Sequence, residues 1–176
     1  MKKITLVSAI ILLIALFFSG CGGNKTGNPN PVSAEQSEKE LRAANDQLYA
    51  ALNAMFTGDL ESMNAIWSHD SIVTDMGPFG GRLEGWGAVG SEFQKEAGMK
   101  LGGKVVCEEL LVHAGTDMGY TVCIEQGENM DADGKPVTVR HRATNVFRKE
   151  NGKWKLVHHH TDLSPDLMKA TGTEMK

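Results

Sequence analysis

Apolar residues recur every three or four positions in the segment that follows Ser33, and this spacing predicts a long amphipathic helix. The residues that would form its buried stripe are Leu41, Ala44, Leu48, Leu52 and Met55. Ser33 and Gln36 have the pattern of a capping box at the start of this helix, and Gly58 is a natural C-terminal stop. We therefore expect one helix to run between Ser33 and Gly58.

Beyond this helix, the pattern predicts two shorter helices and then a series of strands. A helix is expected at residues 60–66, a short strand at 71–76, and a third helix around Trp86 and Phe93. After Gly103 the apolar period changes to two, which is typical of strands with one buried face. Strands are expected near residues 104–113, 118–127, 136–149 and 153–162. Helices followed by an antiparallel meander indicate the α+β class.

The first twenty residues have the pattern of an export signal. Lys2 and Lys3 form a basic start, and the apolar run at residues 4–18 is shorter than the roughly 20 residues of a spanning helix. The sequence FSGC that ends at Cys21 resembles the lipobox of bacterial lipoproteins. We therefore expect a signal peptide at residues 1–20 and a lipid on Cys21. The alternatives are a secretory signal without lipid and an uncleaved anchor.

The segment after the signal is expected to tether a single domain to a membrane. Residues 21–33 are rich in glycine, asparagine and proline, the domain would span residues 34–164, and residues 165–176 are expected to be disordered. By resemblance to lipoprotein sorting, Gly22 in place of an acidic residue favours the outer membrane over the inner, so we expect the protein in the bacterial cell envelope, on the outer membrane facing the periplasm. Cleavage changes the net charge from −4 to 16 − 22 = −6, which argues against nucleic acid as a partner.

With Cys21 lipidated, Cys107 and Cys123 remain, on the two predicted strands that flank Gly115. In a hairpin centred on Gly115, opposed residues have numbers that sum to 230, and 107 + 123 is 230. Directly opposed residues have Cβ atoms about 5 Å apart, which is close enough for a disulfide in an oxidising compartment. The alternative is a pair of buried thiols that pack as small apolar groups.

Three segments of the chain resemble the SnoaL-like branch of the nuclear transport factor 2 fold. They are ALNAMFTGDLESMNAIWSHDSIV at residues 51–73, RLEGWGAV at 82–89 and RATNVFRKENGKWKLVHHH at 142–160. The resemblance implies a curved antiparallel sheet that wraps the long N-terminal helix as a cone, with two shorter helices. It also implies an apolar pocket that takes one small molecule, and homodimers that form through the outer face of the sheet.

The ketosteroid isomerases of this superfamily provide a test of the enzyme hypothesis. Alignment on the shared GDL step places Asp75 at the position of their general base. Ala51 stands where they have a tyrosine donor, and Asn145 replaces their acid on the long strand. Loss of one such donor costs about two to three orders of magnitude in rate. An isomerase, hydrolase or cyclase with Asp75 as base and Asn145 or His160 as partner remains the enzyme alternative.

The association domain of calcium/calmodulin-dependent kinases ends in a similar GKW and VHxH segment. In that family the domain is an assembly module whose pocket binds small acids through arginines. Here Asn145 stands in place of an arginine, although Arg140 or Arg142 could serve in another register. The resemblance therefore also implies a non-catalytic assembly module of the cell envelope.

The three consecutive histidines near the C-terminus are best interpreted as part of a pocket wall. On a regular strand, His158 and His160 would share a face with Trp154 and point into the pocket. A metal site would need a third donor. The candidates for it are His141, His69, Glu108 and Asp75. No HExxH motif or cysteine pair supports such a site, so we expect neither a metal nor another cofactor.

The most direct prediction of function is a lipoprotein whose domain binds a small, largely apolar molecule. A few large or polar side chains are candidates to contact that ligand, although tryptophans at the ends of elements more often pack in the core. These candidates are Tyr49, Trp67, Trp86, Trp154 and His158.

Overall fold

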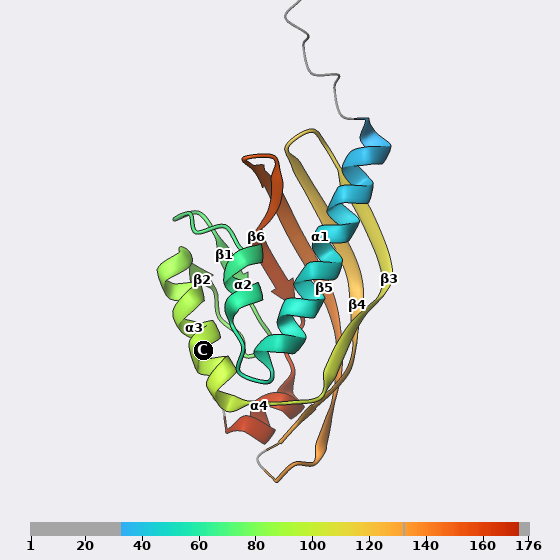
Figure 1. Cartoon of the computed structure of the whole chain (residues 1–176). Helices are drawn as coiled ribbons and strands as arrows, with labels where there is room; N and C mark the ends of the chain where they lie inside the picture. The colour runs from blue at the N-terminus through green and yellow to red at the C-terminus, as the bar shows by residue number, and fades with distance from the viewer. Residues whose placement is uncertain (1–32, 132, 173–176) are drawn as a thin grey trace, which may run out of the picture. The chain divides into compact units, whose positions relative to one another are not determined.

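A curved six-stranded sheet forms the centre of the domain (Figure 1). This computed structural model describes residues 33–131 and 133–172. The strands are β1 (Thr74–Met76), β2 (Leu83–Glu84), β3 (Lys104–Ala114), β4 (Met118–Met130), β5 (Pro136–Glu150) and β6 (Lys153–Thr161). They lie in the order β2-β1-β6-β5-β4-β3, and the sheet does not close. The predicted α+β class is confirmed; β1 is parallel to β6, whereas the other neighbours are antiparallel as expected.

The helices cover the concave face of the sheet and its β1–β2 end (Figure 1). They are α1 (Ala34–Met55), α2 (Glu61–Ile66), α3 (Trp86–Met99) and α4 (Pro165–Thr171). The Ser33 hydroxyl accepts a hydrogen bond of 3.1 Å from the backbone N–H of Gln36, so the predicted start of α1 is confirmed. The predicted signal peptide, the lipidation site at Cys21 and the tether up to residue 32 lie outside the described residues.

Two β-bulges change which side chains face inward. In β6, Leu156 pairs with Phe147 whereas His158 pairs with Val146, so Val157 is an extra residue. In β3, the register with β4 shifts between Glu108 and Leu111. Since each extra residue reverses the alternation of side chains beyond it, a face assigned from period two alone is wrong past the bulge.

Residues 165–171 correct one prediction. They form α4, although residues 165–176 were expected to be disordered. Leu167 and Met168 are buried, and α4 contacts β5. The burial of these two apolar side chains therefore stabilises the helix. A segment this short has no apolar period long enough to predict such packing from the sequence.

The predicted direct opposition of Cys107 and Cys123 is wrong. Cys107 pairs with Glu125, because the turn and the β3 bulge shift the register, and both cysteines are free. The two side chains still hydrogen bond to each other, which lowers the pKa of the Cys107 thiol and raises that of Cys123. Cys123 is buried, as the alternative of packed thiols expects, whereas Cys107 is half-buried.

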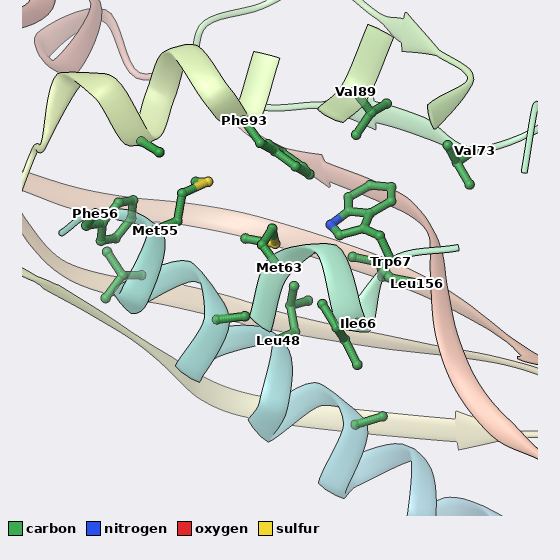
Figure 2. Close-up of a cluster of buried hydrophobic side chains, with 14 of the residues drawn as sticks. Leu48, Met55, Phe56, Met63, Ile66, Trp67, Val73, Val89, Phe93 and Leu156 are labelled. Atoms are coloured by element: carbon green, nitrogen blue, oxygen red, sulfur yellow. The ribbon is translucent and has the colours of Figure 1, made fainter. Parts of the chain in front are cut away.

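The buried core joins α1, α2 and α3 to the inner face of the sheet (Figure 2). Its largest fully buried side chains include Trp67, Phe147, Leu41, Met63 and Leu156. Among the residues that the structure describes, no helix is long and apolar enough to cross a membrane.

Gly119 allows α1 to approach the sheet closely. A Cβ atom at this position would lie 2.5 Å from Leu41 Cδ2 and 2.8 Å from the carbonyl oxygen of His113. We expect Gly119→Ala to lower the free energy of unfolding by about 1–3 kcal/mol through this overlap. In α3, a Cβ atom at Gly98 meets nothing within 4 Å. The control Gly98→Ala is expected to raise stability by about 0.5–1 kcal/mol. Urea unfolding of both variants measures the difference, and equal effects would contradict the close approach.

Candidate functional site

A cavity of about 70 Å³ lies where the helices cover the sheet. Most of its lining is apolar, and the lining includes Leu52, Met55, Met63, Phe93, Val139 and Leu167. Met55, Met63 and Phe93 belong to the core cluster and are labelled in Figure 2. Polar side chains also reach the cavity: Tyr49, Asp75, Glu125, Asn129, His141 and His159. A small, mostly apolar space with convergent polar groups is the usual form of a small-molecule site.

Asp75 brings a carboxyl group to the cavity from β1. Only 4% of the residue is exposed, and its Oδ1 atom has no hydrogen-bond partner. Burial raises the pKa of the Asp75 carboxyl, and the carboxylates of Glu92 and Glu125 raise it further, whereas His159 lowers it. Burial of an unpaired carboxyl is costly, so Asp75 is a poor structural residue and a good candidate for function.

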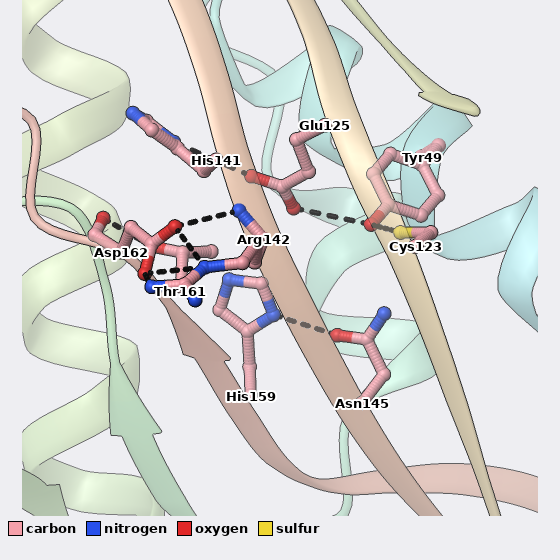
Figure 3. Close-up of polar contacts among 9 residues, drawn as sticks. All are labelled: Tyr49, Cys123, Glu125, His141, Arg142, Asn145, His159, Thr161 and Asp162. Carbon is pink, nitrogen blue, oxygen red and sulfur yellow. Dashed lines mark hydrogen bonds and ion pairs between the residues drawn. The ribbon is translucent and has the colours of Figure 1, made fainter. Parts of the chain in front are cut away.

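His159 lies directly beside Asp75 on the adjacent strand, β6. The two residues are Cα partners of the parallel β1–β6 pair, and both line the cavity. Asn145 Nδ2 points to Asn45 Oδ1 (3.4 Å) and Thr121 Oγ1 (3.3 Å), so Asn145 Oδ1 is left to accept from His159 Nδ1 at 2.7 Å (Figure 3). This bond fixes the ring and leaves Nε2 as the nitrogen that can exchange a proton with a ligand.

A second set of polar side chains, Tyr49 of α1, Glu125 of β4 and His141 of β5, forms a chain of contacts (Figure 3). The Tyr49 hydroxyl donates to Glu125 Oε1 at 3.1 Å, and Glu125 Oε2 lies 3.6 Å from His141 Nδ1. The side chains of Glu125 and His141 are each 5% exposed. Burial raises the pKa of Tyr49, so this phenol stays protonated and remains a donor at neutral pH. The group places a buried carboxyl and a buried imidazole close together at the cavity wall, beside a protonated phenol.

Comparison with protein families agrees with this architecture. Residues 41–164 match the model of the SnoaL-like domain. The chain belongs to the SnoaL-like domain family. A comparison with curated protein sequences gave no match.

Solved structures show the same fold. A protein of Streptomyces avermitilis, provisionally assigned as a dehydratase of the NTF2-like family, has a TM-score of 0.64 and 23% identity over 74% of this chain and 98% of that chain. A Thiobacillus denitrificans protein, provisionally assigned as a calcium/calmodulin-dependent protein kinase type II association domain, has a TM-score of 0.59 and 26% identity over 70% and 94%. An NTF2-like superfamily protein of Salmonella enterica has a TM-score of 0.65 and 13% identity over 74% and 92%.

Within this SnoaL-like domain, the predicted site residues are only partly brought together. Asp75, Tyr49 and Trp67 line the cavity. Asn145 is fully buried behind His159 and positions it rather than facing the cavity. Asp75 and Asn145 are therefore not direct neighbours, because His159 on β6 lies between them.

The expectation that His158 and His160 form the pocket wall is wrong. His160 is exposed, and His158 Nδ1 lies 2.7 Å from the Thr74 hydroxyl away from the cavity. The bulge at Val157 reverses the alternation after Leu156, so His159 takes the inward position.

The remaining predicted aromatic contacts lie outside the cavity. Trp86 is half-buried and stacks on His69 with ring centroids 4.2 Å apart. Trp154 is buried below the Lys149 ammonium, which lies 5.0 Å from its ring centroid. Among the described residues, no group of three or more His, Cys, Asp or Glu side chains has the arrangement of a metal site.

Glu125 and His159 are functional candidates that sequence reasoning missed, whereas His141 was named only as a possible metal donor. For β4 a signal existed: Val122 and Ile124 alternate with Cys123 and Glu125. The structure buries Cys123 and Glu125, although Val122 and Ile124 are the more apolar pair. An acidic residue on the buried face of a strand is itself an indication of a site.

The raised pKa of Asp75 predicts a specific dependence of stability on pH. The folded pKa lies above the ordinary value of 3.8, so the group favours the folded state below about pH 3.8, and this contribution is lost as pH rises through the folded pKa. Asp75→Asn removes the titration. The stability of the variant relative to the wild type should therefore increase between pH 4 and pH 8, by about 1–3 kcal/mol. Urea unfolding at several pH values measures this difference in stability. Glu84→Gln, at an exposed glutamate, is the control. If stability changes with pH in parallel for the wild type and both variants, the prediction is wrong.

Proposed function

We propose that this SnoaL-like domain binds one small, largely apolar molecule in the cavity beside Asp75. The observation that carries the proposal is the buried Oδ1 atom of Asp75, which lines an apolar cavity and has no partner. Native proteins pair nearly all buried polar atoms, so an exception at a cavity indicates that a ligand supplies the partner.

A thermal-shift screen of small apolar and hydroxylated compounds tests the proposal. A ligand present at ten times its Kd is expected to raise Tm by about 3–6 °C. A broad library in which no compound raises Tm would contradict the proposal.

A second candidate function is proton transfer on the bound molecule, with Asp75 and His159 as acid and base. It is favoured by the register of these two residues and by the fixed Nδ1 of His159, which leaves Nε2 for the ligand. The provisional assignment of the Streptomyces avermitilis protein as a dehydratase supports the same class of chemistry. If a turnover is found, Asp75→Asn should lower kcat by about 100-fold or more; an activity that survives this change would remove the mechanism.

We also propose a homodimer formed through the outer face of β3 and β4. Leu111, Met118 and Tyr120 are exposed there by 49%, 45% and 42%. The association-domain relative supports assembly as a property of this fold. Light scattering is expected to give twice the mass of one chain, and Tyr120→Glu should give a monomer; a wild-type monomer would contradict this proposal alone.

The proposed location is the bacterial envelope, with a lipid on Cys21 and the domain on the periplasmic side of the outer membrane. The support is the sequence pattern of residues 1–21. Membrane fractionation of cells tests it, because Cys21→Ser should move the protein out of the membrane fraction. Retention of this variant in the membrane would contradict a lipid anchor.

A further inference from the structure

Unpaired polar atoms at the cavity restrict the chemistry of the ligand. Among the described residues, the buried side-chain nitrogen and oxygen atoms without a hydrogen-bond partner are Asp75 Oδ1, Trp67 Nε1 and Trp154 Nε1. Asp75 and Trp67 both line the cavity, whereas Trp154 lies elsewhere. Each such atom has lost the hydrogen bonds that it would make in water, which is unfavourable as long as it stays unpaired. One cavity thus holds an unpaired acceptor and an unpaired donor.

The arrangement of Trp67 brings its donor to the cavity side of the core. Figure 2 shows its indole nitrogen turned toward Met63 and Phe93, which also line the cavity. The cavity measures only about 70 Å³, so it holds a single small molecule, and both Trp67 and Asp75 belong to its lining.

The ionisable side chains around the cavity, other than the two histidines, are acidic and disfavour an anionic ligand. None of the described residues that line it is a lysine or an arginine, whereas Asp75, Glu96 and Glu125 bring carboxyl groups. His141 is already paired with Glu125. A carboxylate or phosphate would therefore meet like charges in a space of low dielectric.

We propose that the ligand of the cavity is a small uncharged alcohol, whose hydroxyl group donates to Asp75 Oδ1 and accepts from Trp67 Nε1. This inference rests on the proposed function, that the cavity binds a small molecule, and adds the class of that molecule. The rest of the ligand is aliphatic and packs on the apolar lining, including Met55 and Val139.

A hydroxyl fits both atoms better than the other common polar groups. It donates and accepts at once, so it pairs with Trp67 whether Asp75 is ionised or protonated. A carbonyl can accept from Trp67 but offers no proton to an ionised Asp75. An ammonium group pairs with Asp75 but cannot accept from Trp67. A site built for a hydroxyl discriminates strongly against analogues that lack one.

Four compounds with one ring and different polar groups test the proposal by calorimetric titration of the purified protein. They are cyclopentanol, cyclopentanone, cyclopentylammonium and cyclopentanecarboxylate, at constant ionic strength. Cyclopentanol is expected to bind at least about tenfold more tightly than each of the other three, and cyclopentanecarboxylate should not bind measurably.

Matched variants assign the two hydrogen bonds. Trp67→Phe keeps an aromatic ring and removes the N–H group, so it should weaken cyclopentanol by about tenfold. Trp154→Phe removes the other unpaired indole N–H outside the cavity and should leave the affinity unchanged. Asp75→Leu, which removes the acceptor, should also weaken cyclopentanol by about tenfold or more and leave the protein folded.

The outcomes separate this inference from the proposed function. If the ketone or the ammonium compound binds as tightly as the alcohol, or if Trp67→Phe has no more effect than Trp154→Phe, the alcohol assignment is overturned while small-molecule binding stands. If none of the four compounds binds, the alcohol assignment also fails, and the wider thermal-shift screen then decides on binding itself.

Discussion

Val139→Phe is expected to abolish ligand binding, with a loss of about 100-fold or more in affinity. Val139 is 2% exposed on β5 and lines the cavity, so the larger ring would occupy the space that the ligand needs. The overlap should cost at most about 1–3 kcal/mol of stability, because part of the ring enters open space. Calorimetric titration with the best compound of the thermal-shift screen measures the loss.

The control for Val139→Phe is Val106→Phe, which adds the same bulk to a residue that is 38% exposed on β3. This control should bind as the wild type does. If both variants bind normally and fold normally, the ligand does not enter the cavity.

Phe147→Ala is expected to lower the free energy of unfolding by about 3–5 kcal/mol. Phe147 is fully buried on β5, opposite Leu156 and directly before the bulge in β6. Its loss removes apolar burial and leaves a void that neighbouring strands cannot fill. Urea unfolding followed by circular dichroism measures the change.

Ile72→Ala serves as the control for Phe147→Ala, since Ile72 is 59% exposed and should change stability by less than about 0.5 kcal/mol. A loss of less than 1 kcal/mol for Phe147→Ala would show that the inner face of β5 is not the centre of the core.

The helices and strands could be predicted because their apolar periods are long and regular. The stripe on α1 and the alternation after Gly103 gave element positions that the structure matches to within a few residues. The parallel pairing of β1 with β6 could not be read from the sequence, because it depends on where a three-residue strand docks after the chain has folded. Local pattern determines elements better than it determines long-range partners.

The site was predictable only in part, and the bulge explains the largest error. Asp75 was identified through its alignment with a known general base, and the structure places it at the cavity. His158 and His160 were preferred to His159 because strict alternation from Trp154 was assumed. One extra residue, Val157, reverses that assumption, and nothing in its own side chain marks it as a bulge.

The cysteine pair shows the same sensitivity to register. The turn is not centred on Gly115. The backbone N–H of Gly115 donates to the carbonyl of Met118, and Ala114 pairs with Gly119, so the centre of the turn lies between residues 116 and 117. Glu109, which has a positive φ of 53°, then lies within the β3 bulge. These two small shifts are enough to move Cys107 from its expected partner to Glu125.

The central claim, a hollow between α1 and the sheet that admits a small molecule, is tested most directly by xenon binding. The protein would be labelled with ¹³C at its methionine methyl groups and followed by NMR under xenon pressure, since xenon enters apolar cavities. The methyl signals of Met55 and Met63, which line the cavity, should shift with pressure, whereas those of the exposed Met99 and Met118 should not. Unchanged signals of Met55 and Met63 at saturating pressure would contradict the account.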